Sequence, residues 1–214
     1  MQLSPFLSVT ILFFSHSTLT SNKKVNKIKN QILEKKHWEI KNKTLHLQEN
    51  KEERIMKQIK LEINIEACHY DELTEKDRKL IDAACEATKR SYAPYSHFAV
   101  GAAALLENDI VITGTNQENA AYPSGLCAER TTLFYANSQY PDQAVKTLAI
   151  AARTENGFLD TPIPPCGACR QVLLETEKRY GKPMRILLYS KTDIYILENV
   201  SGLLPLSFDG NYLK

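Results

Sequence analysis

Three cysteines and one glutamate lie in two short motifs whose residue types could bind a metal ion and transfer protons. The first motif reads GLCAER over residues 125–130, and the second reads PPCGACR over residues 164–170. Cys166 and Cys169 are three positions apart and can bind one metal together, while Cys127 can supply a third sulfur. Three thiolate ligands favour Zn²⁺ and leave a fourth position for water, as in catalytic zinc sites.

Glu129 is the residue that would make such a metal site catalytic. It follows Cys127 by two positions, so its carboxylate can lie beside the metal without binding it. In zinc deaminases, zinc bound by three cysteines activates a water molecule while a glutamate that is not a ligand transfers protons. The order Cys-x-Glu and then Pro-Cys-x-x-Cys matches that pattern and predicts deaminase chemistry.

Two other interpretations of the cysteines stay open. A Cys-x-x-Cys pair also occurs in structural zinc sites with four cysteines and in thioredoxin-like redox motifs. The remaining cysteines, Cys68 and Cys85, form no second closely spaced pair, and Cys85 lies on the apolar face of a predicted helix. The redox interpretation leaves Cys127 and Glu129 without a role. Both alternatives therefore explain less of the pattern than a catalytic zinc does.

Each motif begins a predicted helix, in a chain where helices and strands alternate. Apolar residues at helical spacing predict helices over residues 75–90, 128–138 and 167–180. Alternating or continuous apolar residues predict strands over residues 97–106, 110–113, 147–152, 185–189 and 194–197. This alternation predicts an α/β layered domain with a mixed sheet. The free N–H groups and the positive dipole end at a helix start stabilise thiolates, which suits cysteines at such positions.

Charge divides the chain into two parts. Residues 1–55 hold ten Lys or Arg against five Asp or Glu, whereas residues 56–214 hold seventeen against twenty. We expect a poorly ordered or dispensable leader over residues 1–55 and a catalytic domain over residues 56–214. The apolar run Leu3–Phe14 could belong to an export signal, but only Met1 and Gln2 precede it and neither is positively charged.

The first element expected in the domain is a strand. Ile59, Leu61, Ile63 and Ile65 alternate with polar residues directly after Met56. Alternation with a period of two is typical of a half-buried strand.

Composition narrows the class of protein further. Of 214 residues, 43% are hydrophobic and 24% are charged, which is ordinary for a globular protein and excludes collagen-like or wholly disordered chains. Five cysteines, an odd number, favour a reducing compartment over a secreted disulfide framework, so we expect a cytoplasmic protein. No apolar run approaches the roughly 20 residues needed to span a membrane. The mildly acidic domain argues against a nucleic-acid partner.

Four blocks of the sequence together resemble the small, homotetrameric type of cytidine deaminase over most of residues 73–208. The blocks, in chain order, are YSHFAVGAA at 95–103, GTNQENAAY at 114–122, CAER at 127–130 and PCGACRQV at 165–172. This resemblance implies a three-layer α/β/α sandwich around a mixed five-stranded sheet. It also implies one Zn²⁺ per subunit, active sites completed by neighbouring subunits, and hydrolysis of cytidine and deoxycytidine to uridine, deoxyuridine and ammonia in pyrimidine salvage.

The resemblance also assigns roles to residues of the two cysteine motifs. Cys127, Cys166 and Cys169 match the zinc ligands, and Glu129 matches the residue that transfers protons to N3 of cytosine and to the departing amine. Zinc with three thiolates carries a net negative charge, which weakens it as a Lewis acid. Our hypothesis is that Arg130 donates hydrogen bonds to ligand sulfurs and offsets part of that charge.

Further positions match the family's nucleoside-binding residues. Asn116 and Glu118 match residues that hydrogen-bond the ribose hydroxyl, and Phe98 matches an aromatic residue that packs near the nucleoside. Ala128, inside the CAER block, belongs to the same substrate-binding set. Phe208 resembles a C-terminal aromatic that covers the base in an adjacent subunit.

Other substrates are possible with the same zinc chemistry. A deaminase of polynucleotide cytosine would need clustered Lys and Arg with stacking aromatics, and only the basic leader offers such charge. A deaminase of a cytosine-containing antibiotic is a second alternative. No residue predicts whether cytidine or deoxycytidine is preferred.

Overall fold

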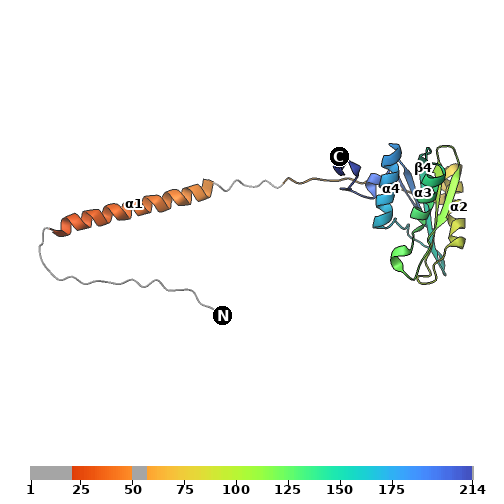
Figure 1. The fold of residues 1–214 in the computed structure, drawn as a ribbon, viewed down its shortest axis with the longest axis horizontal. Helices are drawn as coiled ribbons and strands as arrows, with labels where there is room; N and C mark the ends of the chain where they lie inside the picture. Colours follow the sequence, from red (N-terminus) through yellow and green to blue (C-terminus); the bar gives the residue numbers. More distant parts are fainter. Residues whose placement is uncertain (1–20, 50–56, 214) are drawn as a thin grey trace. The chain divides into compact units, whose positions relative to one another are not determined.

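A computed structural model describes residues 21–49 and 57–213, in two units that comprise residues 1–59 and 60–214 (Figure 1). The first unit contains one Lys-rich helix, α1 (Ser21–Glu49). The apolar run Leu3–Phe14, considered above as an export signal, lies outside the described residues. Among the described helices, none has the length and apolar character that crossing a membrane requires.

The second unit is built on one mixed sheet in the order β1-β7-β6-β4-β2-β3, with β5 paired to β4. Among the described strands, β4 and β6 pair in parallel and all other pairs are antiparallel. The strands are β1 (Glu66–Cys68), β2 (Ala99–Leu106), β3 (Val111–Thr115), β4 (Val145–Thr154), β5 (Gly157–Phe158), β6 (Arg185–Tyr189) and β7 (Ile194–Leu197).

The sheet therefore has two more strands than the five expected. Both additions, β1 and β5, are too short to produce a recognisable alternation in the sequence. Gly157 has φ +102°, a backbone conformation that glycine adopts readily, and it returns the chain so that β5 can pair with β4. The five predicted strands match the longer strands β2, β3, β4, β6 and β7.

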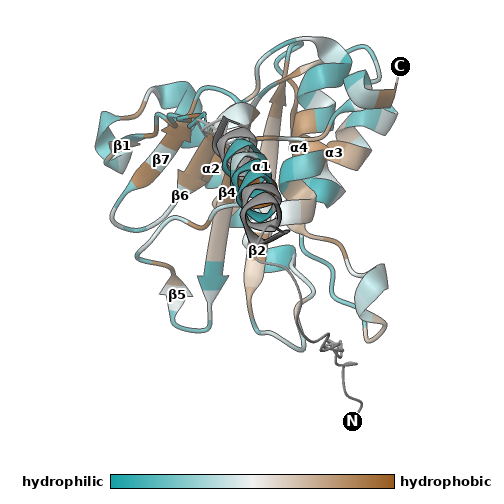
Figure 2. Cartoon of the chain, turned by 90° about the vertical axis from the view of Figure 1, so that its left-hand side faces the viewer, coloured by the Kyte–Doolittle hydropathy of each residue, from teal (hydrophilic) through white to brown (hydrophobic). Residues whose placement is uncertain are grey.

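The three-layer arrangement is confirmed. Helix α2 (Glu75–Ala87) covers one face of the sheet, while α3 (Ala128–Gln139) and α4 (Gly167–Tyr180) lie side by side on the other (Figure 1). Two apolar cores fill the spaces between the layers, one under α2 and one under α3 and α4. Figure 2 shows the hydrophobic residues concentrated in strands such as β6 and β7, as burial between two layers requires.

The strand predicted from Ile59 to Ile65 is wrong. Residues 57–65 belong to no strand, and Ile59, Leu61, Ile63 and Ile65 are 47–75% exposed. Regular pairing with β7 begins only at Glu66. Alternation makes a segment suitable for a sheet, but a strand also needs a neighbouring backbone, and the described part of this chain supplies none there.

Local signals explain where the predicted helices begin and end. The Thr74 side chain accepts a hydrogen bond from the Asp77 N–H and caps α2. Gly181, in the left-handed conformation, ends α4. Cys127 and Cys166 are the N-cap residues of α3 and α4, so both cysteine motifs begin helices as predicted. The packing of α3 against α4 then brings the two helix starts together.

We predict that Gly114→Ala destabilises the domain, because β3 and α3 approach closely at this point. A Cβ atom on Gly114 would lie 2.4 Å from the Thr132 Oγ1 and 2.8 Å from the Thr132 backbone N. Overpacking of this kind costs about 1–3 kcal/mol of unfolding free energy, measurable by urea denaturation. Gly210→Ala is the control, because a Cβ atom there meets nothing within 4 Å. Equal stability of the two variants would contradict this account.

Candidate metal and catalytic site

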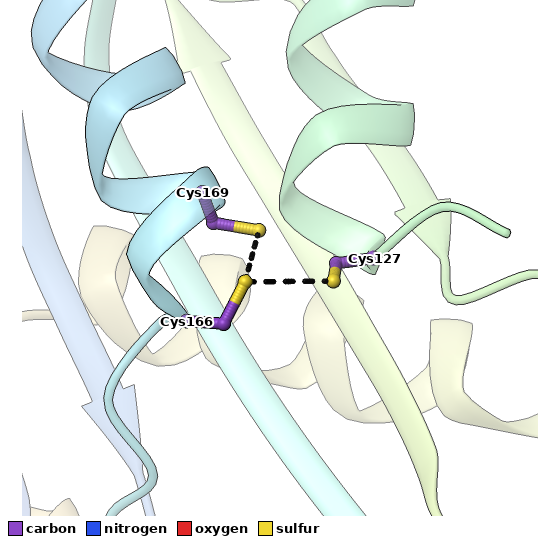
Figure 3. Close-up of side chains that lie close together, drawn as sticks. All are labelled: Cys127, Cys166 and Cys169. Carbon is purple, nitrogen blue, oxygen red and sulfur yellow. Dashed lines mark hydrogen bonds between the residues drawn. The ribbon is translucent and has the colours of Figure 1, made fainter. Parts of the chain in front are cut away.

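Three cysteine sulfurs meet between the first turns of α3 and α4. The Cys166 Sγ lies 3.8 Å from the Cys127 Sγ and 3.4 Å from the Cys169 Sγ, and all three sulfurs are within 4.8 Å of one another. Figure 3 shows the three side chains pointing toward one another from the two helix ends. Cys169 is buried, Cys127 is half-buried and Cys166 is exposed, so the cluster opens to solvent on one side.

The spacing of these sulfurs fits a zinc ion. Ligands at the usual Zn–S distance of about 2.3 Å in a tetrahedron are separated by roughly 3.8 Å. Two of the three separations, 3.8 and 3.4 Å, are close to that value, and the third is within 4.8 Å, so the three sulfurs suit one face of a metal site. Three ligands from one chain leave a fourth coordination position for water or substrate.

The protonation of the cluster is uneven. Hydrogen bonding from Cys169, and then from Arg130 and Cys166, lowers the pKa of the Cys127 thiol to about 5 although burial opposes this. The pKa of the Cys169 thiol is raised, because it donates to Cys127 and is buried. One thiolate is thus already favoured at neutral pH without metal, and metal binding must displace the proton that Cys169 keeps.

Arg130 contacts a ligand sulfur, as the sequence hypothesis requires. Its Nη2 donates to the Cys127 Sγ at 3.7 Å and to the Gly125 carbonyl at 3.4 Å. The hydrogen bond to Cys127 raises the pKa of the Arg130 guanidinium. The Arg130 Nε is buried and has no hydrogen-bond partner in the described part of the chain. The guanidinium therefore lies at the cluster, and its Nε–H donor is not used by the described residues.

Glu129 lies in the first turn of α3 and is 4% exposed. Burial raises the pKa of its carboxyl group, and the negative charge on Cys127 acts in the same direction. A buried carboxyl group whose pKa is raised keeps its proton more readily than an exposed one, which suits a residue that acts as a general acid as well as a base. Arg130 acts in the opposite direction and favours the carboxylate, but its effect is smaller than that of burial.

The Asn116 side chain forms hydrogen bonds with residues before and at the start of β2. Its Oδ1 accepts hydrogen bonds from the Val100 N–H and the Ser91 hydroxyl, and its Nδ2 donates to the Phe98 carbonyl at 2.8 Å. A side-chain amide offers two N–H donors and two acceptor positions. Both acceptor positions are used here, so one N–H remains for a ligand. Asn116 can donate to a substrate hydroxyl but not accept from it.

Glu118 lies two residues further along and is exposed. Its Oε2 accepts from the backbone N–H groups of Tyr95 and Ser96, at 2.9 and 3.3 Å. Hydrogen bonds from Ser96 and then from the Tyr95 backbone lower the pKa of the Glu118 carboxyl group. Glu118 is therefore a carboxylate at neutral pH, and its remaining lone pairs can accept from a ligand hydroxyl.

Two backbone hydrogen bonds join the segment of Asn116 and Glu118 to the cysteine cluster. The Gln117 N–H donates to the Leu126 carbonyl at 2.8 Å, and the Leu126 N–H donates back at 3.0 Å. Leu126 directly precedes Cys127. Sequence analysis missed the hydrogen bonds made by Gln117, Ser91, Tyr95 and Ser96. They join residues that are distant in sequence, so they leave no periodic signal.

The other predicted substrate residues are more dispersed. Phe98 is half-buried beside the Asn116 amide, and Ala128 is fully buried at the start of α3. The Phe208 carbonyl accepts a hydrogen bond from the Gln171 side chain of α4, while its ring is 58% exposed and stacks on Tyr212. The Phe208 role in an adjacent subunit stays a prediction.

Comparison with known proteins gives one consistent family. Residues 74–180 match the family model described as the cytidine and deoxycytidylate deaminase zinc-binding region. The chain is 48% identical over 96 residues to a cytidine deaminase of Halalkalibacterium halodurans, an alignment that spans 45% of this chain and 68% of that protein. It is 46% identical over 97 residues to a cytidine deaminase of Sporosarcina psychrophila, across 45% and 67% of the two chains.

A solved structure supports the same comparison. The crystal structure of cytidine deaminase from Burkholderia pseudomallei aligns with a TM-score of 0.53 and 38% sequence identity. The alignment covers 64% of this chain and 100% of the other. The additional residues of this chain therefore lie outside the shared fold.

We predict that Arg130→Ala changes the cluster in two measurable ways. In zinc-free protein, iodoacetamide should alkylate wild-type Cys127 down to about pH 5, and the midpoint should rise in the variant, because the thiolate loses a donor. Zinc retention should fall by about 10–100-fold, as for other groups that hydrogen-bond metal ligands. Mass spectrometry of the alkylated peptide and chelator competition measure the two effects. An unchanged midpoint together with unchanged zinc retention would contradict the role.

Proposed function

This chain belongs to the cytidine deaminase family, and we propose that it hydrolyses cytidine and deoxycytidine with a zinc ion bound by Cys127, Cys166 and Cys169. The products are uridine or deoxyuridine and ammonia, as pyrimidine salvage requires. The observation that supports this assignment best is the buried Glu129 carboxyl group beside three converging cysteine sulfurs at two helix starts. A purely structural zinc site has no use for a buried carboxyl group beside its ligands.

In the proposed reaction, Glu129 moves each proton. Zinc, when bound, supplies the lowered pKa of a water ligand. The Glu129 carboxylate takes a proton from the attacking water and gives it to N3 of cytosine, which makes C4 more electrophilic. After the water oxygen has bonded to C4, Glu129 takes the second proton from that oxygen and passes it to the 4-amino group. The C4–N bond then breaks, ammonia leaves, and the oxygen remains as the C4 carbonyl. The raised pKa of the buried carboxyl group suits a residue that must act as both base and acid.

The sugar is proposed to bind at Asn116 and Glu118. Hydrogen-bond counting fixes the direction of each contact, because Asn116 has a donor left and Glu118 is an acceptor. A ribose hydroxyl would accept from the Asn116 Nδ2 and donate to the Glu118 carboxylate. Phe98 would pack beside the nucleoside, and Ala128 would line the start of α3 next to the base.

We further propose a cytoplasmic homotetramer with one zinc per subunit. Exposed Phe134 and Tyr135 on α3, together with exposed Phe208 and Tyr212 next to α4, give this side of the subunit an apolar surface suited to contact with other copies. In such an assembly Phe208 would cover the base in a neighbouring site. The free thiols of all five cysteines suit a reducing compartment.

We predict that Glu129→Gln lowers kcat for cytidine by about 10²–10⁴-fold while zinc stays bound, because the amide keeps the shape but cannot transfer protons. Turnover is followed by the absorbance change of the base, and zinc by metal analysis of the same sample. Glu86→Gln is the matched control, because Glu86 is exposed and pairs with Lys89 away from the site. Full activity of the Glu129 variant would exclude the proposed mechanism, and absence of zinc in wild-type protein would exclude the metal.

We predict that Glu118→Gln raises KM for cytidine and lowers kcat/KM by roughly 10–100-fold, the usual range for a lost hydrogen bond to a charged group. Free cytosine lacks the ribose, so the variant and the wild type should deaminate it at the same slow rate. This comparison separates loss of a sugar contact from general damage to the site. An equal loss with cytosine and cytidine would show that Glu118 supports the loop rather than the sugar.

A further inference from the structure

Residues 57–65 have the side chains of a strand but no partner strand. The apolar residues of this segment occupy every second position and are 47–75% exposed: Ile59, Leu61, Ile63 and Ile65. Residues 57–64 make no backbone–backbone hydrogen bond within the part of the chain that the structure describes. The segment leads into β1, the edge strand of the sheet. Unpaired backbone that continues an edge strand is suited to pairing with another chain.

The domain itself does not cover these side chains. An open pocket of about 610 Å³ lies between the segment and the chain that follows β7, with Leu61 and Ile63 on its segment side. Ile63 touches the chain near Gly202, where an added Cβ would lie 3.2 Å from the Ile63 Cγ2. Residues 61–64 therefore line this pocket without backbone hydrogen bonds to the described part of the domain.

We propose that this segment pairs in antiparallel fashion with the same segment of a second copy of this chain, around a two-fold axis at Leu61. Residues 58–64 of the segment, QIKLEIN, are self-complementary in that register. Lys60 lies opposite Glu62 of the second copy, and Ile59 lies opposite its Ile63. Gln58 faces Asn64, and Leu61 faces Leu61. Opposite charges, apolar pairs and amide pairs each stabilise neighbouring antiparallel strands.

Neighbouring registers are less favourable. A two-fold axis at residue 60 places Lys60 opposite Lys60, and an axis at residue 62 places Glu62 opposite Glu62. An axis between two residues would set apolar side chains against polar ones, because side chains alternate between faces. An axis at Ile63 leaves Glu62 opposite the uncharged Asn64. Only the axis at Leu61 pairs both charged residues with each other.

The proposed contact is isologous, since each copy contributes the same surface. It joins the edges of two sheets and is distinct from the apolar surface on α3 and next to α4. None of its side chains belongs to the zinc or nucleoside site described above. Its failure would therefore leave the proposed deaminase activity untouched, and loss of that activity would not bear on the pairing.

Charge reversal in the full chain tests the pairing. K60E and E62K should each weaken association by about tenfold or more, because each replaces two attractive cross-strand pairs with two repulsive ones. The double variant K60E/E62K should associate like wild type. An equimolar mixture of the two single variants should also associate like wild type, because each copy then supplies the charges that the other needs. Sedimentation velocity over a range of concentrations measures these constants.

The control is K191E, which makes the same charge change at an exposed residue paired with Asp160. It should leave association unchanged, and all variants should keep wild-type turnover of cytidine. If K60E and E62K associated like wild type, the proposal would be overturned. A large effect of K60E with none of E62K would indicate the axis at Ile63 and would also overturn it.

Cross-linking tests the position of the axis independently. Leu61→Cys places two thiols at directly opposite positions of paired strands, a separation that suits a disulfide. It should form an intermolecular disulfide in the full chain, identified by mass spectrometry. Ile63→Cys and Ile65→Cys are matched exposed controls, and their thiols would be separated along the paired strands. Cross-linking as efficient at either control position as at 61 would refute the proposed register.

Discussion

The approach of the starts of α3 and α4 is the constraint on which the rest of the site depends. Each start contributes an N-cap cysteine, and the first turn of α4 adds Cys169. Unsatisfied N–H groups and the positive dipole ends of both helices favour negative charge where the sulfurs meet. Arg130 adds a fixed cation at the same place. The protein thus brings three sulfurs together at a position that favours negative charge.

The sheet makes this approach possible. Strands β2 and β4 are rich in alanine and lie at the centre of the domain, so helices can pack closely on both faces. Glu177 accepts from the backbone N–H groups of Met184 and Val200 and thereby fixes the chain that follows α4. The Arg170 guanidinium donates to the Pro165 and Leu203 carbonyls and holds the start of α4 against the C-terminal segment. Cys166 and Cys169 are therefore positioned by contacts at both ends of α4.

Much of this could be predicted from the sequence, because the informative signals are local. The starts of α3 and α4 were predicted from short motifs, and the five longer strands from runs of apolar residues. The two short strands were not, since two or three residues carry no periodicity. The segment from Ile59 to Ile65 was wrongly assigned to a strand, because alternation describes one chain and pairing requires two. Asn116 was expected only at the sugar, and its bonds to Ser91, Phe98 and Val100 depend on contacts distant in sequence.

The parallel pairing of β4 with β6 has a consequence for the order in which the domain folds. A parallel connection needs a long crossover, and here the crossover from β4 to β6 carries Cys166 and Cys169 on α4. Cys127 precedes β4, so the three sulfurs meet only after the crossover has closed and both helices have docked. Closing such non-local contacts is slow compared with forming helices or hairpins. An ion that needs all three sulfurs would consequently be bound late in folding, unlike in zinc fingers, where the metal itself drives folding.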